Sequence, residues 1–302
     1  MPPLPPPRPR PNRPPCRPRS DRFPFQPMSS FGLIIIGDEI LSGKRQDKHM
    51  TQVIQLLQAR GLSLAWCQLV GDDRQRITAA LAQAFQSGDT VFSCGGIGAT
   101  PDDHTRQCAG AALGRELELH PQARDLIESR MRDIAAEQGV RFDPTRPDNV
   151  HRYNMGVFPT GARIIPNPYN KIPGFSLDGP GGGTVHFVPG FPVMAWPMIE
   201  WVLDELYPHL HTTDAGLEKS VIVMGAMEAA LTPLMERIEA DHAVKVFSLP
   251  SVDHPQWGRH IELGVKGAAA AVESAYVALQ AGLREAGAHL GPEMVRKAVA
   301  PN

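Results

Sequence analysis

The sequence has little cysteine and no long apolar run. Its cysteines are scattered and form no C-x-x-C pair, so we expect neither a zinc site nor a disulfide framework. They are Cys16, Cys67, Cys94 and Cys108. A reducing cytoplasm is the compartment that fits this cysteine usage best. No apolar stretch approaches the roughly 20 residues that a helix needs to cross a bilayer, so we expect no membrane partner.

Acidic residues are scarce only at the start of the chain. Residues 1–27 contain 12 of the 30 prolines, six arginines and one acidic residue, Asp21. Such a segment cannot bury a core, so we expect a disordered leader there, without the apolar stretch of a secretory signal. The remainder is acidic, which argues against nucleic acid as a partner. The length of 302 residues, with 42% hydrophobic and 21% charged, allows one large or two ordinary soluble domains.

From residue 31 onward, apolar strands alternate with helical patterns. Residues 31–36, FGLIII, form a continuous β-branched run that is typical of a central parallel strand. Met50, Val53, Ile54 and Leu57 share one face of a predicted helix. The other elements predicted up to residue 138 are strands over 62–70 and 89–94 and helices over 46–60, 74–86, 102–113 and 121–138. This alternation favours a doubly wound α/β fold.

The second half begins with a stretch that prolines interrupt. Residues 149–178 suggest short extended segments, DGPGGG then reads as a hairpin turn, and TVHFVPG reads as a strand. The Met- and Trp-rich residues 191–206 predict a helix packed on the core. Beyond a boundary near 211–216, residues 217–286 predict a βαββα unit, a small α+β domain without a glycine-rich turn or an acidic cluster.

Three glycine or acidic turns follow the first three predicted strands. They are GDEILSG at 37–43, GDD at 71–73 and GGIGATPDD at 95–103. The carboxyl ends of parallel strands meet at one edge of a sheet, where such folds bind their ligands. The coincidence of the three turns therefore predicts a functional crevice at that edge.

The third turn has the composition of a phosphate site with a cation. Glycine allows a ligand to approach the backbone, and Thr100, Pro101 and Asp103 read as the N-cap, first residue and third residue of a helix. Free N–H groups at a helix start bind anions. Asp102 and Asp103 would repel a phosphate unless a divalent cation bridges the two. The alternative is that these acids only stabilise the helix start.

The assembled motifs resemble the MoaB/Mog family, in the branch typified by the amino-terminal half of competence/damage-inducible protein A. The matching stretches are 37–43, Val70-Gly71-Asp72-Asp73, GGIGATPDDHTR at 95–106, GREL at 114–117, GARIIPNP, PGF and VPGFP. The likeness covers residues 31–206. It implies a three-layer αβα domain with a mostly parallel sheet over 28–212, a small KH-like α+β domain over 213–290 and a tail over 291–302.

The resemblance also implies the ligand and its contacts. Members of this family bind molybdopterin or a related phosphorylated nucleotide, and a divalent metal such as Mg²⁺, Mn²⁺ or Co²⁺ would lie at Asp102 and Asp103. The phosphate-binding residues carried over are Gly95, Gly96, Gly98, Pro189 and Gly190. The further expected ligand residues are Gly37, Asp38, Glu39, Ile97 and Thr100, and the expected catalytic residues are Asp72, Asp102 and Asp103.

This chain departs from the family pattern at three places. Cys94 stands where a threonine is usual, Ala99 where a proline is usual, and Asp47-Lys48-His49 where the branch often has D-T-N. Full-length relatives carry a further amidohydrolase domain, and that activity is not expected here.

Three functions remain open from the sequence. The protein could be a molybdopterin-binding protein, a metal-dependent pyrophosphatase acting on ADP-ribose or a similar dinucleotide, or a non-catalytic oligomeric or regulatory protein. In the second case Asp38, Glu39, Asp72, Asp102 or Asp103 would hold or activate water. The family also implies a homo-oligomer, a dimer or trimer, and the apolar helix at 191–206 supports this expectation.

Overall fold

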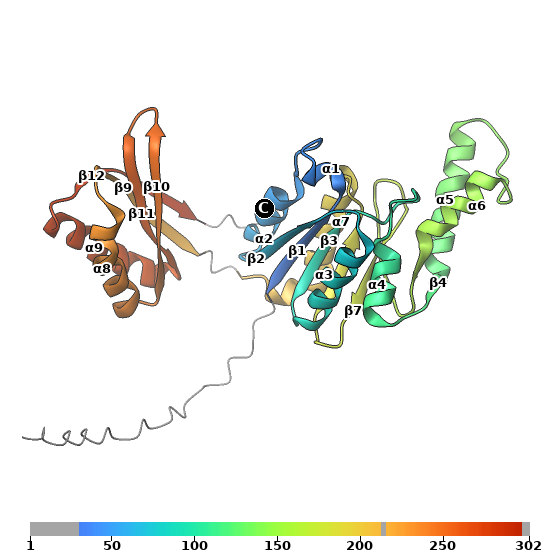
Figure 1. Cartoon of the computed structure of the whole chain (residues 1–302), viewed down its shortest axis with the longest axis horizontal. Helices are drawn as coiled ribbons and strands as arrows, with labels where there is room; N and C mark the ends of the chain where they lie inside the picture. The colour runs from blue at the N-terminus through green and yellow to red at the C-terminus, as the bar shows by residue number, and fades with distance from the viewer. Residues whose placement is uncertain (1–29, 213–215, 298–302) are drawn as a thin grey trace, which may run out of the picture.

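The computed structural model describes residues 30–212 and 216–297 (Figure 1). The expected leader over 1–27 lies outside the described residues. Residues 30–212 form an α/β domain around a six-stranded sheet, and residues 216–297 form a smaller α+β domain.

The large sheet is mostly parallel. Its order is β2 (Leu64–Val70), β1 (Phe31–Ile36), β3 (Thr90–Cys94), β8 (Thr184–Val188), β7 (Gly174–Asp178) and β6 (Arg163–Ile165). The first four strands run parallel, whereas β7 is antiparallel to both β8 and β6. The predicted hairpin turn joins β7 to β8. All six residues of β1 are buried, as its continuous apolar run predicts.

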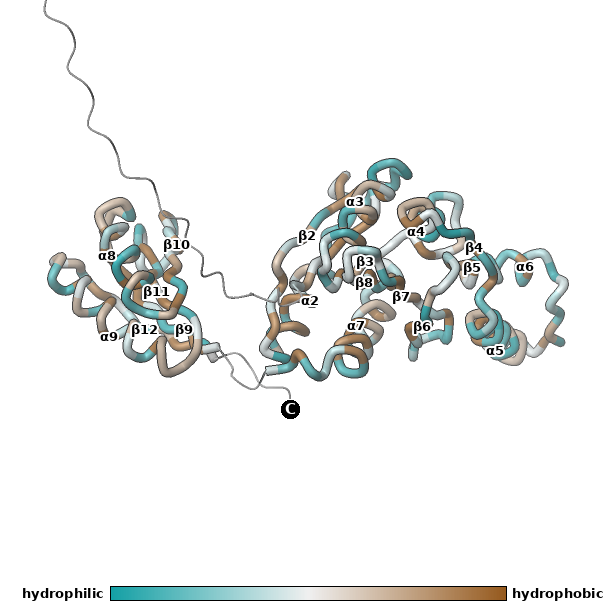
Figure 2. The backbone as a smooth tube through the Cα atoms, turned by 90° about the horizontal axis from the view of Figure 1, so that it is seen from below, coloured by the Kyte–Doolittle hydropathy of each residue, from teal (hydrophilic) through white to brown (hydrophobic). Residues whose placement is uncertain are grey.

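Helices cover both faces of this sheet, which confirms the three-layer architecture. Ile34 and Ile36 of β1 point to the layer of α3 (Arg74–Gln86) and α4 (Thr105–Leu113). Leu33 and Ile35 point to the opposite layer, formed by α2 (His49–Gln58) and α7 (Pro192–Leu206). α7 is hydrophobic along most of its length (Figure 2).

α2 is shorter than the predicted helix over 46–60. Asp47 accepts hydrogen bonds from the backbone N–H groups of His49 and Met50, so the helix begins there. Met50 is exposed rather than buried, and the buried residues of the helix are His49, Val53, Leu56 and Leu57.

A helical excursion projects from the α/β domain between α4 and β6 (Figure 1). It consists of α5 (Pro121–Glu137), α6 (Pro147–Tyr153), a 3-10 turn (Asn154–Gly156) and a pairing of β4 (Leu117–Leu119) with β5 (Val157–Pro159). The sequence predicts extended structure from residue 149, but α6 is helical. Pro147 occupies its first turn, where proline is tolerated, and His151 and Arg152 suit its last turn.

The second domain is a four-stranded antiparallel sheet with two helices packed on it. The sheet order is β10 (Val244–His254), β11 (Gly258–Gly267), β9 (Leu217–Met224) and β12 (His289–Lys297). α8 (Glu228–Asp241) and α9 (Ala269–Glu285) bury one apolar cluster against it. The α+β class is confirmed, and the likeness to a KH domain stays a prediction.

β12 corrects the expected tail over 291–302. This strand pairs with β9 through Lys297, and the ladder shifts register between Leu290 and Glu293. Gly291 and Pro292, which read as strand breakers, lie within that irregularity. Residues 298–302 lie outside the described residues.

Within the described ranges, no helix combines the length and the hydrophobicity that crossing a membrane would need.

A buried polar chain joins the sheet to the end of α7. The His186 side chain is fully buried, its Nδ1 lies 2.7 Å from Ser176 Oγ, and its Nε2 lies 2.8 Å from the Tyr207 hydroxyl. Burial lowers the pKa of His186 to about 3, so the ring is neutral at pH 7. Both ring nitrogens therefore have partners, as a buried imidazole requires.

Tyr207→Phe tests this chain of hydrogen bonds. The substitution removes one partner of a buried ring nitrogen, so we expect a loss of about 1–3 kcal/mol in the free energy of unfolding. Tyr169→Phe, at a side chain that is 62% exposed, serves as the matched control and should change little. Urea unfolding measures both variants, and equal losses would contradict a specific role for Tyr207.

Candidate functional site

A cavity of about 400 Å³ lies at the carboxyl ends of β1, β3 and β8. The structure brings nearly all the predicted site residues together around it. The predicted residues that line it are Gly37, Glu39, Asp72, Gly95, Gly96, Ile97, Gly98, Thr100, Asp102, Asp103, Pro189 and Gly190. Asp38, the remaining predicted residue, is not among the lining residues. A cavity therefore lies at the sheet edge where the sequence predicts a functional crevice.

The glycine turn after β3 has a backbone that other residues could not adopt easily. Gly95 and Gly96 have φ angles of 110° and 68°. A Cβ at Gly95 would lie 2.3 Å from the Ile36 carbonyl oxygen, and one at Gly96 would lie 2.1 Å from Thr105 Oγ1. Glycine is thus required both by conformation and by space.

The N–H groups of this turn are free to bind a ligand. Within the described part of the chain, those of Gly96, Ile97 and Gly98 donate to no protein group. The adjacent carbonyls are occupied instead, because the buried Arg106 guanidinium donates to Ile97 O at 2.9 Å and to Gly98 O at 2.6 Å. Burial lowers the pKa of Arg106, and nearby Asp103 opposes that shift. Consecutive free N–H groups of this kind form an anion-binding concavity.

The helix after the turn begins later than predicted. α4 starts at Thr105, and Thr100 to Asp103 form a separate tight turn. Asp103 Oδ2 accepts hydrogen bonds from the Thr100 N–H at 2.8 Å and from Thr100 Oγ1 at 2.6 Å. The Thr105 N–H donates to Gly96 O at 3.0 Å. Thr100 therefore closes a turn with Asp103 instead of capping a helix, and the free N–H groups belong to the glycine turn.

Carboxylates from three loops converge beside the glycine turn. Asp38 and Asp72 are joined reciprocally, because the Asp38 N–H donates to Asp72 Oδ2 at 2.9 Å and the Asp72 N–H donates to Asp38 Oδ1 at 3.1 Å. Burial raises the pKa of Asp72, and the charges of Asp38, Glu39 and Asp102 raise it further, against the hydrogen bond from Asp38. Asp102 itself is exposed. The free site therefore concentrates negative charge.

The described residues contain no ready-made metal cage. Among residues 30–212 and 216–297, no group of three or more His, Cys, Asp or Glu side chains is arranged to hold a metal ion. Magnesium, however, usually takes one or two carboxylates together with phosphate oxygens and waters. The converging acids therefore suit a cation that a phosphate ligand brings or completes.

Several lining residues were not predicted from the sequence. Arg45 is the basic residue that lines the cavity, and the others are Ile36, Ala99, Met155, Asn167, Asn170, Ile172, Pro173, Phe191 and Met194. Asn167 shapes its loop, since its side chain bonds Asn170 Oδ1 at 2.8 Å and Ile172 O at 2.9 Å. The sequence signal for Asn167 and Asn170 was the asparagine-proline spacing in PNPYN. Arg106 does not line the cavity but binds the turn carbonyls, and its signal was its place at the end of the motif GGIGATPDDHTR.

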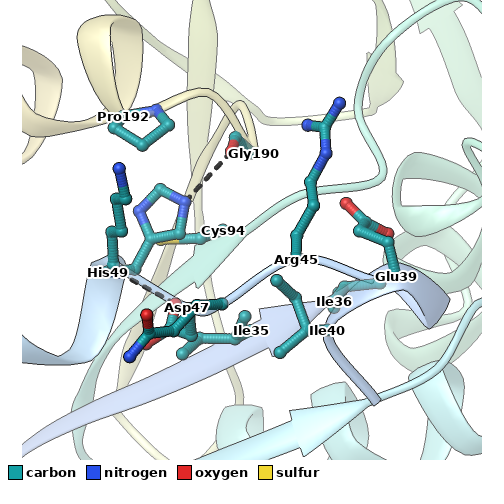
Figure 3. A pocket seen from close by; sticks show the side chains of 12 residues that line it. Ile35, Ile36, Glu39, Ile40, Arg45, Asp47, His49, Cys94, Gly190 and Pro192 are labelled. Carbon is teal, nitrogen blue, oxygen red and sulfur yellow. Dashed lines mark hydrogen bonds between the residues drawn. The ribbon is translucent and has the colours of Figure 1, made fainter. Parts of the chain in front are cut away.

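Two departures from the family pattern have structural outcomes. His49 Nε2 lies 3.1 Å from Gly190 O, so His49 links the start of α2 to the Pro189-Gly190 turn (Figure 3). Cys94 is buried at the end of β3, and burial strongly raises the pKa of its thiol. The thiol is therefore neutral at pH 7.

Arg106→Gln tests whether the buried arginine holds the turn. Charge-assisted hydrogen bonds contribute about 1.5–3 kcal/mol each, so we expect a loss of roughly 3 kcal/mol in the free energy of unfolding. Arg106→Lys should not restore it, because an ammonium lacks the two-pronged geometry. Arg76→Gln, on an exposed part of α3, is the control and should change little by urea unfolding. Full stability of Arg106→Lys would refute the two-pronged contact.

Comparison with known proteins gives a consistent family assignment. A family model described as a probable molybdopterin binding domain matches residues 32–209. The CinA-like protein of Anaeromyxobacter dehalogenans (strain 2CP-C) is 33% identical over 207 residues, which are 68% of this chain and 48% of that relative. The CinA-like protein of Citrifermentans bemidjiense is 33% identical over 206 residues, which are 68% of this chain and 46% of that relative.

The chain thus spans about half the length of these curated relatives. The crystal structure of the CinA protein of Thermoplasma acidophilum, of unknown function, has a TM-score of 0.50 at 25% identity and covers 59% of this chain and 99% of that chain. The family model matches more than half of the chain. The protein therefore belongs to the family of the probable molybdopterin binding domain, and it is similar to CinA-like proteins over about two thirds of its own length.

Proposed function

We propose that the cavity binds a phosphorylated pterin or nucleotide, with its phosphate on the glycine turn. The observation that carries this proposal is the row of free N–H groups at Gly96, Ile97 and Gly98, whose neighbouring carbonyls Arg106 binds from inside. These three residues line the cavity together with Pro189 and Gly190. Fixed backbone donors suit a phosphate because they are arranged before the ligand arrives.

Part of the lining of the same cavity suits a flat ring. Met155, Phe191 and Met194 supply apolar and aromatic surface, and the Phe191 side chain is 56% exposed. Asn170 adds a side-chain amide. A pterin and a purine are both flat and edged with hydrogen-bonding groups, so this side of the cavity accommodates either ring.

We propose that a divalent cation, Mg²⁺, Mn²⁺ or Co²⁺, accompanies the phosphate. Asp102 and Asp103 are the proposed ligands, and Asp72 lies within reach of the charge of Asp102. The support is electrostatic, because carboxylates beside a phosphate repel it until a cation offsets the charge. A bound cation would supply charge neutralisation at the phosphate oxygens.

A metal-dependent pyrophosphatase acting on ADP-ribose or a similar dinucleotide remains the second candidate. The observation in its favour is the raised pKa of Asp72, which makes that carboxylate a better proton acceptor. In this reading Asp72 takes a proton from a water whose oxygen forms a bond to one phosphorus of the diphosphate, while the bond from that phosphorus to the bridging oxygen breaks and the other phosphate leaves with that oxygen. A non-catalytic binding or regulatory protein would use the same cavity without this step.

Asp102→Asn separates the cation site from a purely structural role. Asp102 is exposed and its loss relieves repulsion, so the stability of the free protein should stay near wild type or rise slightly. Binding of Mg²⁺ and of phosphate should fall together by at least tenfold, about 1.4 kcal/mol. Asp103→Asn is the matched variant, and it should also cost stability because Asp103 closes the turn with Thr100.

Thermal shift with and without Mg²⁺ and phosphate measures both variants. Unchanged Mg²⁺ and phosphate responses in Asp102→Asn would contradict the cation proposal.

Incubation of the wild-type protein with Mg²⁺ and ADP-ribose, followed by detection of AMP, tests the pyrophosphatase candidate, and absence of AMP favours a binding protein.

We also propose that the protein forms a homo-oligomer, a dimer or trimer, through the α/β domain. α7 and its N-cap residue expose apolar side chains, with Phe191 56% and Val193 53% exposed. Light scattering at micromolar concentration should give a multiple of the 32.9 kDa chain mass. Val193→Glu should shift the mass toward the monomer, because a buried charge is costly in an apolar interface. A monomeric wild-type protein would refute the proposal.

A further inference from the structure

A second cavity of about 310 Å³ adjoins the one that holds the glycine turn. The two share four lining residues, Ile36, Glu39, Arg45 and Gly190. Figure 3 shows this second cavity, which we call the side cavity, with the Arg45 and His49 side chains rising on two sides and Gly190 between them. A ligand that lies on the glycine turn thus has room to continue past Gly190.

The side cavity differs from the main cavity in its charge. Arg45 and Lys48 bring two cationic side chains to its lining. Within the described residues, neither side chain makes a hydrogen bond or an ion pair. The main cavity carries Glu39, Asp72, Asp102 and Asp103 against Arg45 alone.

Among the described residues, neither acidic residue of the side cavity forms an ion pair with Arg45 or Lys48. Asp47 uses both carboxylate oxygens to accept the His49 and Met50 N–H groups at 2.8 and 3.0 Å, which fixes it at the start of α2. Glu39 lies where the two cavities meet, beside Arg45 (Figure 3). Arg45 and Lys48 therefore remain as unpaired donors for an anionic group.

The turn at Gly190, which borders both cavities, is held in place by His49. The His49 side chain is 5% exposed and its ring contacts the Gly190 carbonyl at 3.1 Å. This contact fixes the turn that borders both cavities relative to the segment that carries Arg45 and Lys48. Fixed geometry of this kind lowers the entropic cost of binding a ligand with two anionic ends.

We propose that the side cavity is a second phosphate subsite, in which Arg45 and Lys48 hold the outer phosphate of a ligand with two linked phosphate groups. The inner phosphate lies on the glycine turn, so this inference rests on the proposed function. Arginine suits the task because its planar guanidinium can donate two parallel hydrogen bonds to phosphate oxygens.

Calorimetric titration with inorganic phosphate and with pyrophosphate, both at saturating Mg²⁺, tests the proposal. The wild-type protein should bind pyrophosphate at least tenfold more tightly than phosphate. Arg45→Gln should remove most of this preference, because it should weaken pyrophosphate binding more than phosphate binding. Lys48→Gln should reduce the preference in the same direction, and the double variant should bind both anions alike.

Lys44→Gln is the matched control, because Lys44 is exposed and lines neither cavity. It should keep the wild-type preference. The subsite is refuted if Arg45→Gln weakens both anions equally, or if the double variant keeps the preference for pyrophosphate. If wild-type protein binds neither anion, the proposed function itself fails, and this inference falls with it.

Discussion

The two hydrogen bonds from the buried Arg106 guanidinium to the turn carbonyls are the constraint on which the site depends. They hold Ile97 and Gly98 in one orientation, and the neighbouring N–H groups are left without protein partners. A buried cation is expensive unless it is well hydrogen-bonded, so the turn and the arginine stabilise each other. The proposed phosphate site is therefore built from the interior outward.

Three further contacts place the loops around that turn. The reciprocal bonds of Asp38 and Asp72 join the ends of β1 and β2, and Thr100 and Asp103 close the segment before α4. His49 holds the Pro189-Gly190 turn through the contact of its ring with the Gly190 carbonyl. Each contact uses a polar side chain on a backbone group, which fixes loops that have little apolar burial of their own. The negative charge that results is the reason a cation is part of the proposal.

The sequence predicted the crevice because its signals are local and repeated. Glycines and acids directly after apolar strands define the edge of a parallel sheet, and the structure brings them together. The helix start was misplaced because Thr100 and Asp103 have the spacing of a capping box and instead close a turn before α4. β12 was missed because Gly291 and Pro292 lie at an irregularity that only the paired strand reveals.

Other site residues could not be found from the sequence, because long-range packing brings them in. Asn167 and Asn170 come from a segment after the helical excursion, where the PNPYN spacing marks a turn but does not place that turn against the glycine turn. Arg45 lies in a loop without periodicity. The assignment of the α/β domain was possible from motifs, whereas the charge pattern of the two adjoining cavities required the structure.

The central claim is that the glycine turn binds phosphate through its backbone. Backbone amide NMR spectra of the isotope-labelled protein, recorded during titration with phosphate and Mg²⁺, test it most directly. The account predicts that the Gly96, Ile97 and Gly98 amide resonances show the largest shifts, and that these shifts grow when Mg²⁺ is present. Shifts confined to other regions, or no shift at these three amides at saturating phosphate, would contradict the account.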